Sequence, residues 1–132
     1  MTEGYSGTPL FKKLGIKPAS RLRVLHAPAH YRELLTGMPV TAVIVQQDAD
    51  MIHAFYSEKA LLERELPVLA DEIPKDGMIW VSWPKKSSGL PTDITEDVIR
   101  GVALGLGLVD VKVCAVDGVW SGLKLVWRLT NR

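Results

Sequence analysis

Short apolar runs alternate with segments of helical periodicity along most of this chain, and this alternation limits the fold more than any other feature. The runs are rich in β-branched and aromatic residues, which favour strands. They cover residues 22–27, 40–45, 51–56 and 78–83. Strands that alternate with helices form mostly parallel sheets with right-handed crossovers. The pattern therefore predicts an α/β protein with helices on both faces of its sheet.

Helices are predicted between these runs by apolar spacing and by residues that begin or end a helix. A short helix is expected over residues 10–14 and another over residues 30–35. Longer helices are expected after Ser57 and after either Thr92 or Thr95, because their hydroxyls can cap a helix N-terminus.

Three residues disturb the two longer helices. Pro67 lies inside the first pattern, and an interior proline removes a backbone hydrogen bond, so a kink or break is expected near residues 63–66. Gly101 and Gly105 weaken the second helix by roughly 1 kcal/mol each relative to alanine. The alternative is that these glycines allow close packing on the sheet.

The end of the chain carries a two-residue period. Valine and alanine alternate with other residues over 109–116, and apolar residues do so again over 123–129. Asp117 and Gly118 lie between these segments, and both can adopt the positive φ that a tight hairpin needs. The sequence therefore predicts a C-terminal antiparallel hairpin.

A parallel sheet that ends in an antiparallel hairpin is the arrangement of the Rossmann-like methyltransferases. The chain resembles a shortened version of that fold, without the strand–helix units that would follow the second strand. The predicted architecture is α/β, a three-layer Rossmann-like, mostly parallel sheet with a C-terminal antiparallel hairpin and strand order 2-1-3-4-6-5. Residues 1–132 are expected to form a single domain. Residues 1–20, punctuated by glycine and proline, are expected to be a loosely attached N-terminal lead-in.

Composition excludes several classes of protein. The formal net charge is +1, so no overall charge recruits nucleic acid or a membrane, and neither partner is expected. Cys114 is the only cysteine, which excludes an internal disulfide and a cysteine-rich zinc site. No stretch approaches the ~20 apolar residues of a membrane span, and no signal peptide is visible. A cytoplasmic location is therefore expected.

Several strings, which together cover most of the chain, carry a family resemblance. They are Gly4-Tyr5-Ser6-Gly7-Thr8-Pro9-Leu10, Lys13-Leu14-Gly15-Ile16, Trp83-Pro84-Lys85-Lys86, Pro91-Thr92-Asp93, Thr95-Glu96-Asp97, Lys112-Val113-Cys114-Ala115-Val116-Asp117 and Trp120-Ser121-Gly122-Leu123. This combination resembles an uncharacterised bacterial family, a domain of unknown function found largely in actinobacteria. The resemblance implies a small Rossmann-like domain with a methyltransferase-like fold, and it brings no catalytic residue with it. Residues 38–51 fit the family least.

A nucleotide-type cofactor is normally held by a glycine-rich turn after the first strand, because only glycine lets the backbone approach the ligand. The sequence at that place is His26-Ala27-Pro28-Ala29-His30. Gln46 and Gln47 follow the second strand, where an acidic residue would bind a ribose. The chain is therefore predicted to bind neither a dinucleotide nor S-adenosylmethionine in the usual mode, and no cofactor is expected.

The loop after the fourth strand is the strongest candidate for a binding site. Lys85, Lys86, Ser87, Ser88 and Gly89 combine two cations with two hydroxyls and lead towards a helix N-terminus. These features favour an anion. The alternative is a solvated connection between strand and helix.

Ligands of open α/β sheets bind beyond the carboxyl ends of the strands, where the strand order reverses. The candidates at that crevice are His26, His30, Tyr56, Ser57 and Asp93. His26 is either a general base near Tyr56 or Ser57 or a hydrogen-bonded structural residue. No third ligand accompanies the two histidines, so no metal site is expected.

Two functions remain open. The first is a non-catalytic or degenerate Rossmann-like domain that binds a protein partner or a small ligand. The second is a small enzyme, or a sensor, that acts on a phosphorylated or other anionic metabolite. Residues 1–32 carry a net charge of +5, which also suits an anion near the lead-in. Ligand identity and oligomeric state do not follow from the sequence.

Overall fold

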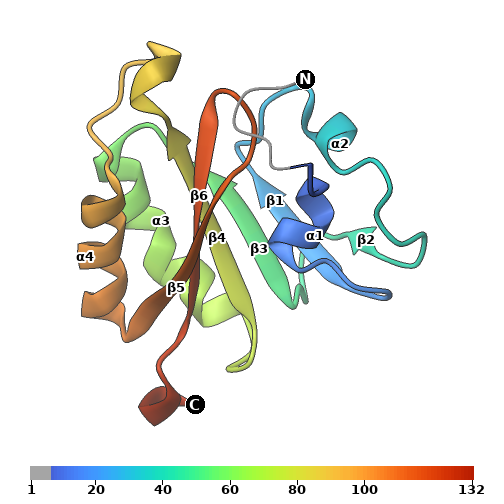
Figure 1. Ribbon diagram of the computed structural model, residues 1–132. Helices are drawn as coiled ribbons and strands as arrows, with labels where there is room; N and C mark the ends of the chain where they lie inside the picture. Colours follow the sequence, from blue (N-terminus) through green and yellow to red (C-terminus); the bar gives the residue numbers. More distant parts are fainter. Residues whose placement is uncertain (1–6) are drawn as a thin grey trace.

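A six-stranded mixed sheet forms the centre of the computed structural model, which describes residues 7–132 (Figure 1). Its strands are β1 (Arg21–Leu25), β2 (Val43–Ile44), β3 (Met51–Phe55), β4 (Met78–Pro84), β5 (Leu108–Ala115) and β6 (Trp120–Trp127). The order β2-β1-β3-β4-β6-β5 is the predicted one. Strands β1 to β4 pair in parallel, and β6 pairs antiparallel with β4 and β5, which confirms the C-terminal hairpin.

Helices cover both faces of this sheet (Figure 1). They are α1 (Leu10–Leu14), α2 (Tyr31–Leu34), α3 (Lys59–Glu72) and α4 (Glu96–Leu106), with 3-10 helices η1 (Lys86–Ser88) and η2 (Leu129–Asn131). The first two helices pack on one face, and α3 and α4 pack on the other. No helix within residues 7–132 combines the length and apolar character that crossing a bilayer requires.

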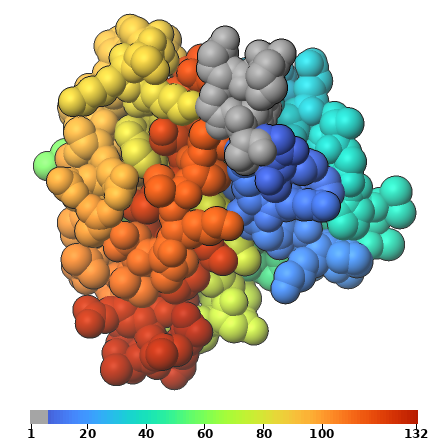
Figure 2. Space-filling view, viewed as in Figure 1, coloured from blue at the N-terminus to red at the C-terminus, as the bar shows by residue number. Residues whose placement is uncertain are grey.

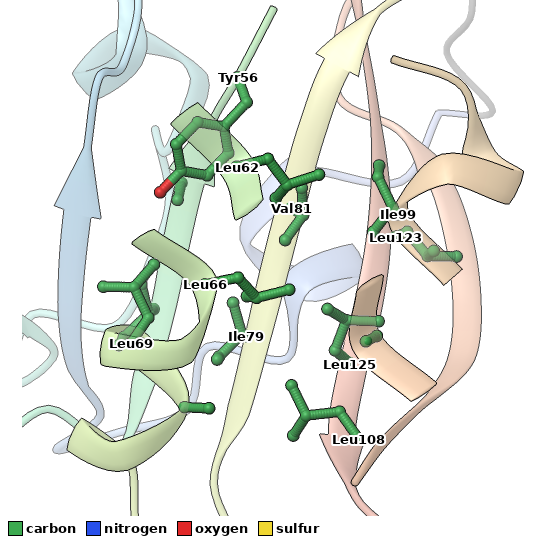
Figure 3. Close-up of a cluster of buried hydrophobic side chains, with 14 of the residues drawn as sticks. Tyr56, Leu62, Leu66, Leu69, Ile79, Val81, Ile99, Leu108, Leu123 and Leu125 are labelled. Atoms are coloured by element: carbon green, nitrogen blue, oxygen red, sulfur yellow. The ribbon is translucent and has the colours of Figure 1, made fainter. Parts of the chain in front are cut away.

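The core beneath α3 and α4 follows the periodicity of the sequence (Figure 3). Leu62 and Leu66 point from α3 towards Val81 and Ile79 of β4, whereas Leu69 lies on the side of β1; all five are buried. Burial of one such side chain contributes about 1.5–3 kcal/mol. Strands β3 and β4 are apolar on both sides because they lie in the middle of three layers.

The described part of the lead-in is packed into the structure. Leu10, Leu14 and Ile16 are buried, and Nε1 of Trp80 donates to the carbonyl oxygen of Leu14 at 2.9 Å. Within the lead-in expected over residues 1–20, these apolar side chains of residues 10–16 complete the core on the α1 face. Residues 1–6 of that prediction lie outside the described residues.

Two other elements differ from their predicted form. The second strand pairs only at residues 43–44, because Ala42 donates to the carbonyl oxygen of Pro39 and closes a turn before it. Helix α3 continues from Lys59 to Glu72 through Pro67, so the break expected near residues 63–66 is absent.

The hairpin and α4 contain further differences. Asp117 and Gly118 do not adopt positive φ; instead, Oδ1 of Asp117 accepts the backbone N–H groups of Val119 and Trp120, both at 2.8 Å. Cβ atoms added at Gly101 and Gly105 would meet nothing within 4 Å, so close packing on the sheet does not explain these glycines.

A bulge interrupts the alternation of β5. Asp110 lies opposite Leu125 of β6, but Lys112 lies opposite Lys124, so the register shifts between them. The residue between, Val111, is 54% exposed. A bulge of this kind redirects the side chains that follow it to the other face of the sheet.

Candidate functional site

The loop between β1 and α2 begins with a strained residue. His26 has φ +59°, in the left-handed region that a non-glycine residue rarely adopts. Its Nε2 donates to Oε1 of Glu65 on α3 at 2.9 Å, and its ring meets that of Tyr56 edge-on at 5.5 Å between centroids. His26 directly follows β1 and Tyr56 directly follows β3, so both residues lie at the carboxyl ends of neighbouring parallel strands.

Glu65 joins the two residues that the sequence suggested for this crevice. Its Oε1 also accepts the hydroxyl of Tyr56 at 2.7 Å. Burial opposes ionisation of Glu65, but the hydrogen bonds from Tyr56 and His26 outweigh it and lower the pKa of the carboxyl group. Burial, together with the hydrogen bond to Glu65, raises the pKa of Tyr56. The result is an ionised carboxylate that holds one imidazole and one neutral phenol.

His30 makes a second histidine–carboxylate pair from the same loop. Its Nε2 lies 2.9 Å from Oδ2 of Asp117 in the hairpin. Burial opposes ionisation of Asp117, but hydrogen bonds from His30, Trp120 and Val119 lower the pKa of this carboxyl group. The two imidazoles are thus tied to opposite sides of the molecule, His26 to α3 and His30 to the β5–β6 connection.

A hollow of about 310 Å³ opens beside the pair formed by His26 and Glu65. It lies between β1 and α3 and is lined by Arg23, Leu25, Arg64, Glu65, Val68, Leu69 and Glu72. Its floor is apolar, and Arg23 is bound to Glu72. Within residues 7–132, Arg64 makes no hydrogen bond or ion pair. The hollow therefore combines apolar surface with one unpaired guanidinium at its rim.

Two predicted crevice residues, Ser57 and Asp93, form hydrogen bonds between the start of α3 and the segment before α4. Oδ1 of Asp93 accepts the N–H of Lys59 at 2.7 Å, so this carboxylate satisfies the first turn of α3. The carbonyl oxygen of Ser57 accepts the hydroxyl of Thr92, also at 2.7 Å. Neither contact joins His26 or Glu65. Helix α3 is thus capped from the segment before α4, and the hydroxyl of Ser57 does not supply its cap.

The predicted anion-binding loop is largely bonded to itself. Ser88 donates its hydroxyl to the carbonyl oxygen of Lys85 at 2.7 Å and accepts the N–H of Leu90 at 3.1 Å. Gly89 has φ +78° and closes the 3-10 turn. Lys86 and Ser87 are exposed. The expectation that Lys85, Lys86, Ser87, Ser88 and Gly89 bind an anion stays a prediction.

Sequence reasoning missed Glu65, Arg64 and Asp117 as site residues. Glu65 follows Glu63 and Arg64 on a charged stretch of α3, where nothing in the sequence separates it from a solvated face. The sequence marks Asp117 only as a turn residue. Both contacts span long sequence distances, 39 residues for His26 with Glu65 and 87 for His30 with Asp117, so only the folded chain brings these pairs together.

A backbone turn at Pro28 leads from the loop of residues 26–30 into α2. The N–H of Tyr31 donates to the carbonyl oxygen of Pro28 at 3.0 Å, and Pro28 has no N–H to offer. The imidazole of His26 lies against Tyr56 beyond the ends of β1 and β3. Among the residues that the structure describes, no group of three histidine, cysteine, aspartate or glutamate side chains is placed to hold a metal ion.

Comparison with known proteins supports the fold alone. No family model and no curated protein sequence matches the chain. A SAM-dependent methyltransferase from Aquifex aeolicus superposes with a TM-score of 0.69 at 12% identity, covering 88% of this chain and 86% of that one. A putative methyltransferase from Thermoplasma acidophilum superposes with a TM-score of 0.58 at 8% identity, covering 92% of this chain and 75% of that one. Magnesium protoporphyrin IX methyltransferase from Synechocystis, solved with bound SAM, superposes with a TM-score of 0.55 at 11% identity. This match covers 90% of this chain and 74% of that one. The chain therefore has a methyltransferase-like Rossmann fold.

Proposed function

We propose that this chain is a ligand-binding Rossmann-like domain whose ligand lies in the hollow between β1 and α3, next to His26. One observation carries the proposal: Glu65, which binds His26, also lines a hollow of about 310 Å³. Small-molecule pockets have volumes of about 300–1,000 Å³, are mostly apolar and contain few polar groups.

The lining residues suggest the chemistry of the ligand. Leu25, Val68 and Leu69 favour an apolar body, and the unpaired guanidinium of Arg64 favours a carboxylate, which it can bind in a bidentate manner. We therefore infer a small acid with an apolar body. The proposal keeps the anionic ligand expected from the sequence but assumes a site beside α3 instead of the loop of residues 85–89.

The fold of the structural neighbours raises S-adenosylmethionine as a ligand, but the residues of this chain do not fit its usual seat. Pro28 supplies no N–H, and the loop has no glycine that would let the backbone approach a ligand. The ring of His26 meets that of Tyr56 edge-on beyond the ends of β1 and β3. Methyl transfer is therefore not part of the proposal.

Proton transfer to a bound ligand is the second candidate function, and the orientation of His26 favours it. Its Nε2 bonds to Glu65, and no described residue hydrogen-bonds its Nδ1. A carboxylate that orients an imidazole through one nitrogen leaves the other available to accept a proton from a ligand. The proposal of binding does not depend on this second step.

NMR titration of the full chain with hexanoate and with phenylacetate tests the binding proposal. Amide shift changes are expected at residues 23–26 and 64–69. Arg64→Gln should weaken binding at least tenfold, whereas Lys59→Gln, which removes an exposed cation from the same helix, should leave it unchanged. Equal weakening by both variants, or shift changes that avoid these residues, would refute the proposal.

A further inference from the structure

A second hollow, of about 390 Å³, lies between α1 and β5, on the opposite face of the sheet from α3. Figure 2 shows α1 in blue meeting β5 in orange on the near side of the molecule. The residues that line this second hollow are Thr8, Lys12, Lys13, Lys112, Val113, Cys114 and Ala115. None of these described lining residues is acidic, so three ammonium groups share one recess.

The bulge in β5 directs one of these cations into the recess. Before the bulge, Asp110 faces α4, where it binds Arg100 at 3.1 Å. After the register shift, Lys112 lies opposite Lys124, and Lys124 lies opposite Trp80 of the core under α1. Without the extra residue, Lys112 would face the side of α3 and α4. The bulge thus interrupts the ladder pairing and moves a lysine onto the α1 face.

The pairing that results is electrostatically unfavourable in the protein alone. Lys112 and Lys124 occupy directly opposite positions on antiparallel strands, where like charges destabilise the sheet. No described residue forms an ion pair with either lysine. A bound anion would remove this repulsion.

Other cations are directed at the same place. Lys13 donates to the carbonyl oxygen of Ala115 at 3.2 Å, which fixes its ammonium group over the end of β5. Burial raises the pKa of the Cys114 thiol, and the charges of Lys13, Lys112 and Lys85 act on it in the opposite direction. Three ammonium groups therefore lie within electrostatic range of one sulfur atom. Lys85 comes from the predicted anion-binding loop, so one residue of that prediction belongs to this cluster.

We propose that the recess between α1 and β5 binds a phosphorylated small molecule, with Lys12, Lys112 and Lys124 as its principal cations and Lys13 and Lys85 in support. A multiply charged phosphate group suits several lysines, because each ammonium is a compact charge with three donors. The recess has the size of a small-molecule pocket. This site is separate from the hollow beside His26, and it does not depend on the function proposed there.

Thermal unfolding of the full chain with inorganic pyrophosphate, at ionic strength held constant with sodium chloride, tests this site. The wild type should gain several degrees in melting temperature at millimolar pyrophosphate. Lys112→Gln combined with Lys124→Gln should bind pyrophosphate at least tenfold more weakly. Without ligand, this double variant should melt at a higher temperature than the wild type, because the repulsion is gone.

Two control variants distinguish binding in the recess from a general charge effect and from binding at the loop of residues 85–89. Lys59→Gln combined with Arg128→Gln removes the same charge elsewhere and should keep the full response to pyrophosphate. Lys86→Gln should also keep it, whereas binding at the loop would require Lys86. Amide shifts of the wild type, followed by NMR during the same titration, should change at residues 12–13 and 112–115.

Several results would overturn the proposal. One is the absence of any pyrophosphate-dependent shift in the wild type, and another is equal loss of the shift in the two double variants, which would indicate a general counterion effect. Shift changes confined to residues 86–89 would assign the anion to the loop. A response to single-stranded RNA without one to pyrophosphate would replace the small molecule by a nucleic acid.

Discussion

The hydroxyl of Tyr31 lies 2.7 Å from Nδ1 of His53, and the other ring nitrogen of His53 lies 2.7 Å from Oγ of Ser82. His53 is fully buried, so both ring nitrogens are satisfied inside the protein. His53 is therefore a core residue with a hydrogen-bond partner at each ring nitrogen. Burial lowers the pKa of His53 to about 3, so the imidazole is neutral in the folded protein.

This buried histidine predicts a specific dependence of stability on pH. The unfolded chain binds a proton on His53 below about pH 6.5, and the folded chain does not until about pH 3. The contribution of His53 to the free energy of unfolding is therefore complete above pH 6.5. It decreases by about 1.4 kcal/mol per pH unit as the pH falls from 6.5 towards 3. We expect the free energy of unfolding to drop by about 2 kcal/mol from this group between pH 6.5 and 5.

Urea denaturation at several pH values measures this drop. His53→Gln keeps hydrogen-bonding groups but does not titrate, so its free energy of unfolding should change less over the same range. A parallel pH dependence in both proteins would show that His53 does not titrate on unfolding in this way.

Substitution of Asp117 should destabilise the hairpin. Its carboxylate accepts N–H groups from Val119 and Trp120 and binds His30. Asp117→Ala removes all three contacts and should lower the free energy of unfolding by about 1–3 kcal/mol. Asp117→Asn keeps an acceptor for the turn and should cost less. Because the pKa of Asp117 is lowered in the fold, its contribution is complete above the ordinary value and is lost as the pH falls through the lowered one.

Chemical denaturation of the two Asp117 variants at pH 7 provides the comparison. Equal losses for Ala and Asn would assign the whole effect to the charge and the contact with His30. A negligible loss for Ala would contradict the role of Asp117 in the turn.

Two glycine-to-alanine substitutions should have opposite effects. A Cβ at Gly77 would lie 2.8 Å from the carbonyl oxygen of Asp50, so Gly77→Ala should lower the free energy of unfolding by about 1–3 kcal/mol. A Cβ at Gly105 would meet nothing within 4 Å on an exposed face of α4, so Gly105→Ala should raise it by about 0.5–1 kcal/mol. Melting temperatures of both variants, measured together, test the pair; destabilisation by Gly105→Ala would mean that the helix face is packed.

S-adenosylmethionine should not bind this chain in the usual mode. The loop of residues 26–30 has no glycine, and Pro28 offers no backbone N–H. Isothermal titration calorimetry should therefore detect no binding at micromolar concentrations. Micromolar affinity, with the ligand in contact with residues 26–30, would contradict this prediction.

The sequence by itself determined which segments form the strands of the sheet, and the resemblance to the Rossmann-like methyltransferases supplied their order. Apolar runs such as 51–56 and 78–83 can be buried on both faces only in the middle layer of three, and the period of two after residue 108 requires a hairpin. Local residue types also determined ends of helices: Gly15 adopts φ +84° after α1, and the hydroxyl of Thr95 accepts the N–H of Val98 before α4.

Tertiary structure alone decided the residues that form the two hollows. His26 is visible in the sequence, but its partner Glu65 lies on a helix 39 residues away, and only packing of α3 against β1 brings them together. The bulge in β5 likewise turns Lys112 to the α1 face, opposite Lys124, although the sequence alternation alone places it with Asp110. The physical reason is range: turns and caps depend on contacts between near neighbours, whereas charge pairs, buried hydrogen bonds and recesses depend on segments that the fold brings together.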